Sequence, residues 1–342
     1  MLSRLIRMRW PIPVIALVGL LLVVGLAVLT GSDDDALVVY NGRSHYGDEQ
    51  VFEDFTEATG IAVEIRGGTA PELFERLENE GDDTPADVLV TTDLANLWRA
   101  EEAGMLQPAT SEALSENIPE DLHDPDGYWW ALTTRLRVPV IATERVAEGE
   151  VTSYEDLGDP AFRGRTCLRT SANEYNQSLV ADMIAKRGEA ATEELLRSWM
   201  ANDPEIINSD GEMLAVIAEG GCDLGLSNHY YLARILEEEP DFPVAPAWPD
   251  QDGAGAHANV SGAGIVAGSD RPEEALALIE YLTSADAQVL LAAQGEFAAN
   301  PDVPPAEQVE SWATVVTDPI AVDEAGPLLE DAIALMLEVG WR

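Results

Sequence analysis

Four of the eight tyrosines follow short apolar runs of the chain. Tyr46 stands in NGRSHYGD, Tyr175 in TSANEYNQS, and Tyr230 and Tyr231 stand side by side in SNHYYLAR. His45 immediately precedes the first of them. Taken singly, each of these residues would most often be an ordinary surface or packing residue. Their occurrence together in three separate loops indicates a shared site.

Phenol oxygens are suited to a hard trivalent cation. Fe(III) prefers anionic oxygen ligands. A free tyrosine ionises only near pH ~10, but a bound metal ion changes the local electrostatics and can ionise its own ligands. Several tyrosinates around one Fe(III) would form a strong, proton-coupled site, and one imidazole could complete it. The candidate metal ligands are therefore His45, Tyr46, Tyr175, Tyr230 and Tyr231.

The elements that must position these loops alternate between strand and helix. Amphipathic helical patterns follow short β-type runs near 37–40, 61–65 and 86–90. A second alternating region begins after the apolar run 135–142 and includes a strand at 166–169. The tail carries one strong helical pattern over 325–339. This order predicts an α/β fold with largely parallel sheets.

Two extended runs, near 135–142 and 258–267, connect the two α/β halves. They predict a hinged two-lobe fold in which the chain leaves lobe one, builds lobe two and returns. Ligands of open α/β sheets bind beyond the carboxyl ends of the strands, which here face the cleft between the lobes. His257 is expected to form hydrogen bonds at the hinge or cleft. The expected boundaries are 36–136 plus 262–305 for lobe one and 137–261 plus 306–342 for lobe two.

The first 35 residues predict export from the cytoplasm. Three arginines precede an uncharged run over 11–30, and three aspartates follow it. That run has about the length needed to cross a bilayer, roughly 20 residues, and the flanking charges place everything downstream outside. Residues 27–32 offer no clear cleavage site and no cysteine for lipidation. We therefore favour an N-terminal membrane anchor, with a cleaved signal peptide as the alternative, and a periplasmic or cell-surface location.

Composition excludes several classes of function. The formal net charge is −44, which would repel the phosphates of nucleic acid. Only one apolar run can span a membrane, so the chain is not a channel or permease. Outside the cell, Cys167 and Cys222 are expected to form a disulfide, with two buried thiols as the alternative. Two cysteines alone cannot form a tetrahedral zinc site.

A series of segments, in a constant order over most of residues 37–300, resembles the ferric-ion-binding proteins of iron ABC transporters, particularly the cyanobacterial type. The resemblance implies a two-lobe periplasmic-binding fold with a closing cleft and an ABC permease as partner. It also implies iron ligands at His45, Tyr46, Tyr175, Tyr230 and Tyr231. The similar segments are VVYNGRSHYGDE, PADVLVTTDLANLWRAEEAGMLQP, PDGYWWALTTRLRV, SYEDLGDP, CLRTSANEYNQSLV, SNHYYLAR and GAHANVSGAGIV.

The sequence departs from the family pattern at several places. One extra residue precedes His45. Thr92 stands where some members carry a ligand glutamate, and the neighbouring Asp93 is predicted to be a helix N-cap. Some members bind an anion through the turn at 170–173, which four tyrosinates would make redundant. Arg234, one turn beyond the tyrosine pair, could balance phenolate charge.

The function predicted from these observations is that of a monomeric binding protein that carries Fe(III) to an ABC permease. The sequence has no nucleophile elbow, phosphate loop or zinc-binding helix motif, so we do not expect an enzyme. Fold similarity is weak support for ligand identity. The alternatives are therefore the same fold with a small anion or polyamine as ligand, and an exported enzyme that uses Tyr–His acid–base chemistry.

Overall fold

The computed structural model describes residues 36–43 and 49–342. The N-terminal segment predicted to be an anchor or signal peptide lies outside this part of the chain, as do His45 and Tyr46. Among the described residues, no single helix is long and apolar enough to cross a membrane. The helices α9 (Pro272–Thr283) and α10 (Ala285–Ala292) together have the length and the apolar composition of a membrane span, but the chain bends by 65° between them.

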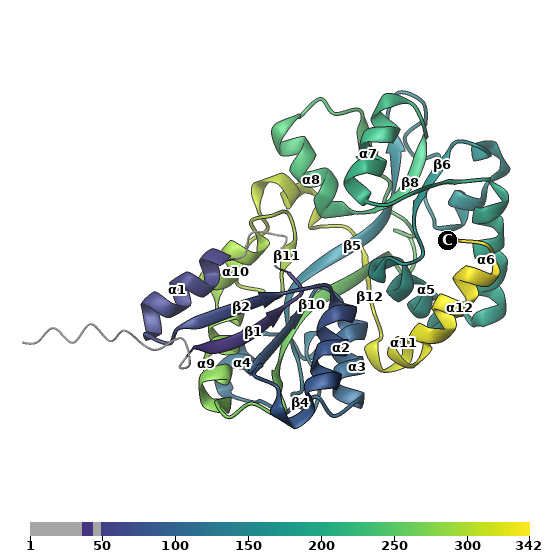
Figure 1. The fold of residues 1–342 in the computed structure, drawn as a ribbon. Coiled ribbons are helices and arrows are strands. Elements are labelled where there is room, and N and C mark those ends of the chain that lie inside the picture. Colours follow the sequence, from purple (N-terminus) through teal and green to yellow (C-terminus); the bar gives the residue numbers. More distant parts are fainter. Residues whose placement is uncertain (1–35, 44–48) are drawn as a thin grey trace, which may run out of the picture.

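The first half of the chain builds parallel strands with helices between them (Figure 1). The strands β1 (Leu37–Asn41), β2 (Val63–Gly67) and β3 (Val88–Thr91) pair in the order β2-β1-β3. The intervening helices are α1 (Glu49–Thr59), α2 (Ala70–Glu80) and α3 (Leu94–Glu102). Burial follows the apolar periodicity of the sequence, because α1 buries Val51, Phe52 and Phe55. The α/β fold class is confirmed.

Two long antiparallel strands connect the halves. Strand β5 (Trp130–Ala142) begins five residues earlier than the sequence indicated, and β10 (Ala256–Val266) returns beside it. The first part of β5 pairs with β10, and its last part pairs with β8 (Leu224–Asn228). Figure 1 shows β5 running from one half of the molecule into the other. The two strands therefore occupy the position expected of a hinge.

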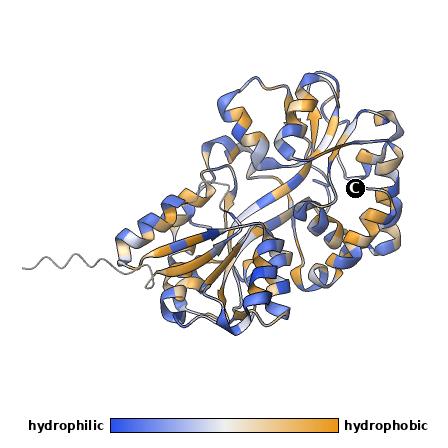
Figure 2. Ribbon diagram, in the orientation of Figure 1, coloured by the Kyte–Doolittle hydropathy of each residue, from blue (hydrophilic) through white to orange (hydrophobic). Residues whose placement is uncertain are grey.

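The second half repeats the alternation of strand and helix. Its parallel strands pair in the order β8-β6-β7, where β6 is Thr166–Arg169 and β7 is Glu205–Ile207. Its helices are α5 (Glu174–Arg187), α6 (Glu189–Ala201), α7 (Asp210–Glu219) and α8 (His229–Glu238). Hydrophobic residues are concentrated in the strands of both halves (Figure 2). The lobe boundaries drawn from the sequence stay a prediction.

The prediction of one continuous helix over 325–339 is wrong. The tail instead forms α11 (Val322–Ala325), a 3-10 turn (Gly326–Leu328) and α12 (Leu329–Glu338). Pro327 cannot donate the backbone hydrogen bond that a continuous helix needs. The backbone at Gly326 also lies against Trp98, where an added Cβ would overlap the indole ring. The break therefore follows from both proline chemistry and tertiary packing.

Several short elements were not predicted because they are too short to show a period. They are β4 (Leu106–Gln107), α4 (Glu112–Asn117), β9 (Val244–Pro246), β11 (Phe297–Ala298) and β12 (Thr317–Pro319). Strands β11 and β12 pair with β5 and β10 respectively. They bring the segment after α10 against the hinge.

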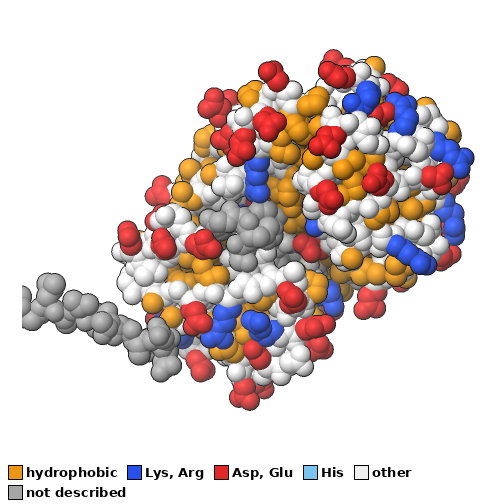
Figure 3. Space-filling view, turned by 45° about the horizontal axis from the view of Figure 1, so that its top comes forward, with side chains coloured by type: hydrophobic (Ala, Val, Ile, Leu, Met, Phe, Trp, Pro, Cys, Tyr) orange, Lys and Arg blue, Asp and Glu red, His pale blue; other side chains and the backbone are white. Residues whose placement is uncertain are grey.

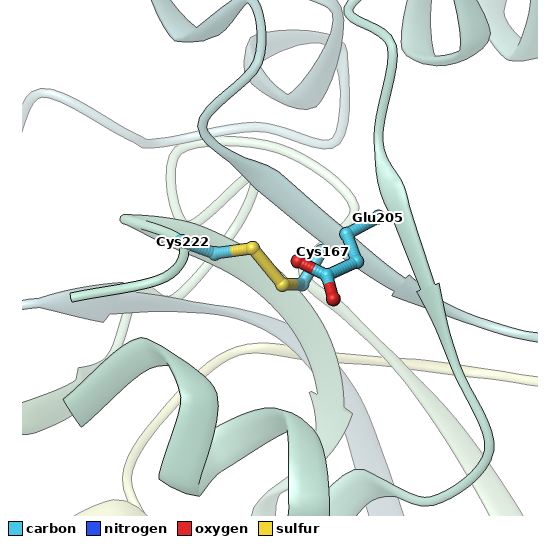
Figure 4. Close-up of side chains that lie close together, drawn as sticks. All are labelled: Cys167, Glu205 and Cys222. Atoms are coloured by element: carbon cyan, nitrogen blue, oxygen red, sulfur yellow. A yellow bond between two sulfur atoms is a disulfide. The ribbon is translucent and has the colours of Figure 1, made fainter. Parts of the chain in front are cut away.

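The two cysteines form a disulfide, which confirms the favoured alternative. Cys167 on β6 and Cys222 before β8 are 55 residues apart in sequence, with their Cα atoms 5.9 Å apart. Figure 4 shows the carboxylate of Glu205 beside the two sulfurs. Because the sulfurs are bonded to each other, they cannot act as thiolate ligands for a metal ion. The disulfide instead joins neighbouring segments of the second sheet.

Candidate metal centre

Three of the predicted ligands come together at the start of two helices. Tyr175 is the second residue of α5, and Tyr230 and Tyr231 are the second and third residues of α8. The hydroxyl of Tyr230 lies 3.5 Å from that of Tyr175, and the rings of Tyr230 and Tyr231 are 4.4 Å apart. Tyr175 and Tyr230 are buried and Tyr231 is half-buried. His45 and Tyr46 lie outside the described residues, so their position relative to this cluster stays a prediction.

The positions of these tyrosines favour negative charge on their oxygens. Both helices follow a strand, β6 or β8, and present their N-terminal ends to the cluster. The N-terminus of a helix carries a partial positive charge from its aligned peptide dipoles. Tyrosinates, or an anionic group bound beside them, are therefore stabilised at this place.

Burial opposes ionisation of the phenol as long as no cation compensates for it. Burial raises the pKa of Tyr175 to about 12, against the opposing effect of the Arg135 guanidinium. The neighbouring Glu174 and Tyr231 raise it further. The phenol of Tyr175 is thus protonated at neutral pH. A trivalent cation would have to displace this proton, so binding should release protons.

Three arginines surround the phenol rings. The guanidinium carbon of Arg135 lies 5.9 Å from the ring centre of Tyr175, and that of Arg234 lies 4.9 Å from the ring centre of Tyr230. Arg169 interacts electrostatically with Tyr231 and Tyr175. Fixed positive charges of this kind favour the ionised form of a neighbouring phenol. The arrangement can therefore offset the charge of several tyrosinates around one ion.

A buried carboxylate holds Arg135 in place. Glu296 accepts from Arg135 Nε at 3.0 Å and from Arg43 Nη1 at 2.9 Å. Arg43 also donates to the hydroxyls of Thr133 and Ser261 at the hinge, at 2.8 and 2.7 Å. The chain thus enters the segment containing His45 and Tyr46 from a residue fixed at the hinge. The sequence reasoning missed this network.

A second network braces the two tyrosine-bearing helices. Arg137 donates to the side chains of Asn176 at 2.8 Å and Asn228 at 3.0 Å, and it pairs with the buried Asp210 at 3.4 Å. Asn176 directly follows Tyr175, and Asn228 ends β8 just before the tyrosine pair. Arg135 and Arg137 both lie within an apolar run of the sequence. This placement could have indicated the network, because a guanidinium buried with an apolar strand requires polar partners.

Two predictions about individual residues are confirmed near the cleft. Asp93 caps α3, because its carboxylate accepts the backbone N–H of Ala95 at 3.0 Å. His257 forms hydrogen bonds on the hinge strand β10, with its Nδ1 3.0 Å from Asp182. Its backbone N–H donates to the hydroxyl of Tyr154 at 2.9 Å.

A cavity of about 350 Å³ lies on the opposite side of the hinge from the tyrosines. Side chains alternate along a strand. Arg135 faces the tyrosines, so its neighbours Thr134 and Leu136 face the cavity, together with Ala258 and Val260 of β10. The remaining wall is mostly apolar and includes Phe297, Trp312 and Ile320. Tyr175, Tyr230 and Tyr231 do not line this cavity, so it is distinct from the cluster that they form.

The visible face of the protein carries scattered charges of both signs. Figure 3 shows carboxylates spread over this face, with basic side chains between them. This distribution agrees with an acidic, solvated surface.

Residues 83–317 match a family model described as bacterial extracellular solute-binding protein. Iron uptake protein A1 of Synechocystis sp. is 39% identical over 323 residues, which are 92% of this chain and 89% of that protein. A solved Trichodesmium structure in complex with iron and citrate is 35% identical, with a TM-score of 0.83 over 90% of this chain and 100% of that one. A ferric binding protein from Campylobacter jejuni is 28% identical, with a TM-score of 0.84 over the same shares of the two chains.

Proposed function

The chain belongs to the family of bacterial extracellular solute-binding proteins, and from that premise we propose that it binds Fe(III) and delivers it to an ABC permease. The observation that carries the proposal is that Tyr230 lies against both Tyr175 and Tyr231 at the N-terminal ends of α5 and α8. The relatives described as iron uptake and ferric-binding proteins support the same ligand.

In the proposed site, Tyr46 and His45 join the three tyrosines as the remaining ligands. Both follow β1 in the first half of the chain, whereas the other three belong to the second half. An ion held by both halves would draw them together, because only the closed arrangement satisfies all of its ligands. The turn at 170–173 could hold an accompanying anion, although four tyrosinates would not require one.

The remaining parts of the proposal concern setting and partners. The protein works outside the cytoplasm as a monomer, tethered through residues 1–35 or released by their cleavage. The family is one of solute-binding proteins, and we expect no catalytic activity. Release of iron to the permease requires that the tyrosinates weaken, through protonation or through reduction of the ion. Iron release should therefore accelerate as pH falls.

The colour of the iron-loaded protein tests the proposal. Ferric phenolate complexes absorb visible light, so protein loaded with Fe(III) should be orange to red. The double variant Tyr230→Phe/Tyr231→Phe should lose the band and most of the iron affinity, because phenylalanine keeps the ring and removes the ligand oxygen. The matched control is Tyr128→Phe/Tyr281→Phe, which removes two half-buried hydroxyls outside the cluster.

A colourless protein after loading with Fe(III) would rule out the proposed ligand and leave the small-anion or polyamine alternative. Iron affinity that survives in Tyr230→Phe/Tyr231→Phe, measured by chelator competition, would show that the site is misplaced. Circular dichroism of each variant separates loss of the site from loss of the fold.

A further inference from the structure

The buried carboxylate of Asp93 lies where three parts of the chain meet. Asp93 follows β3 and precedes α3, and its exposed fraction is 0%. One of its hydrogen bonds is the cap of α3, accepted from Ala95 at 3.0 Å. An ionised carboxylate can accept about four hydrogen bonds. The cap therefore leaves acceptor sites for groups outside α3.

The other donors come from the second half of the chain and from the hinge. Ser178 Oγ on α5 lies 2.8 Å from Oδ1 and 2.7 Å from Oδ2 of Asp93. Asn259 Nδ2 on β10 donates to Oδ2 at 2.8 Å. These partners are 85 and 166 residues away in sequence. One carboxylate thus joins the end of β3, the helix α5 and the hinge strand.

The same helix connects this contact to the tyrosines. Ser178 is three residues after Tyr175, so the two side chains share one face of α5 about one turn apart. Beside Asp93, the hydroxyl of Thr92 lies 3.4 Å from the carboxylate of Glu174, the residue before Tyr175. Two adjacent residues after β3 therefore contact the first turns of α5, on either side of Tyr175.

We propose that Asp93 is a positioning residue whose hydrogen bonds to Ser178 hold the α5 half of the protein against the β3 half. This interlobe latch rests on the proposed iron binding for its purpose, because it sets how closely the half that carries Tyr175 lies against the half that carries β3. Hydrogen bonds to an ionised acceptor are stronger than neutral ones. Opening of the cleft would break the bonds to Ser178 and leave the cap of α3 intact.

The variant Ser178→Ala tests the interlobe latch, because it removes only the donor that crosses between the halves. Its matched control is Ser198→Ala on α6, whose hydroxyl donates to Leu195 within the same helix. In iron-free protein, small-angle X-ray scattering should give a larger radius of gyration for Ser178→Ala. Iron should leave the loaded variant for a chelator about 10- to 100-fold faster, with the visible band unchanged. The control should match the wild type in both measurements.

A second variant keeps the test decisive if Ser178→Ala fails to fold. Asp93→Asn removes the charge but still caps a helix, and it should raise the radius of gyration and the release rate in the same direction. If the folded variants match Ser198→Ala in both quantities, the interlobe latch does not exist. A colourless wild type would overturn the iron proposal alone, since the scattering comparison uses iron-free protein.

Discussion

Glu296 shows how one buried side chain can serve both stability and the site. Its carboxylate is shared between Arg43, which precedes the predicted ligands His45 and Tyr46 in the sequence, and Arg135, which faces Tyr175. Burial raises the pKa of Glu296, but the two guanidinium groups outweigh that effect and lower it to about 2. Removal of one partner from a buried ion pair leaves the others uncompensated.

We expect Glu296→Gln to lower the free energy of unfolding at pH 7 by about 3–5 kcal/mol, because two buried guanidinium groups lose their counter-charge. The ordinary pKa of the side chain is 4.5, so this stabilisation is complete above pH 4.5 and is lost as pH falls towards 2. The variant should therefore lose less additional stability than the wild type over that range. Urea unfolding at several pH values measures both effects.

The control for this prediction is Glu53→Gln, at an exposed position of α1. It removes one carboxylate without a buried partner, and its acid unfolding should follow that of the wild type. Equal losses of stability in the two variants at pH 7 would contradict the structural role given to Glu296.

At the scale of elements, the break between α11 and α12 depends on a close approach that only glycine permits. Gly326 places its backbone against Trp98 of α3, and the chain then turns at Pro327. After α12, the indole N–H of Trp341 donates to the backbone oxygen of Arg169 at 2.8 Å. The tail thus packs on elements from both halves of the protein.

Gly326→Ala should lower the free energy of unfolding by about 1–3 kcal/mol, because the new methyl group would displace the Trp98 ring. Gly211→Ala in α7 is the control, since a Cβ there meets no atom within 4 Å. That change should be neutral or slightly stabilising. Thermal unfolding of both variants measures the difference. Equal unfolding midpoints for the two variants would show that the close approach of Gly326 to Trp98 does not contribute to stability.

At the scale of the whole molecule, the hinge has two unlike sides. One side carries the tyrosines and the interlobe latch, and the other carries the cavity of about 350 Å³. Rotation about β5 and β10 that opens the first side must bring the walls of the second together. We therefore expect opening to require the space behind the hinge.

Ala298→Leu should favour the closed arrangement, because Ala298 lines the cavity and a larger side chain resists its collapse. We expect iron release to slow by about two- to tenfold and the radius of gyration of the iron-free protein to fall. Ala201→Leu, at an exposed position of α6, is the control. Unchanged release in Ala298→Leu would show that the cavity does not limit opening.

Much of the architecture could be predicted from periodicity. The strand at Thr166–Arg169 was predicted with its observed bounds, and the extended runs predicted near 135–142 and 258–267 overlap β5 and β10. The short strands were missed because two or three residues carry no period. The helix break at Gly326 was missed because Trp98, which lies against it, is distant in sequence.

The sequence alone was sufficient for the α/β class, the hinge strands and the identities of Tyr175, Tyr230 and Tyr231 as candidates, because side-chain type and local period are properties of neighbouring residues. Only the tertiary structure placed those three phenols in contact and surrounded them with Arg135, Arg169 and Arg234. It alone revealed that Asp93, which the sequence already predicted as a helix N-cap, also bonds to Ser178, 85 residues away. Contacts of that kind depend on how the chain returns through space, which no local pattern records.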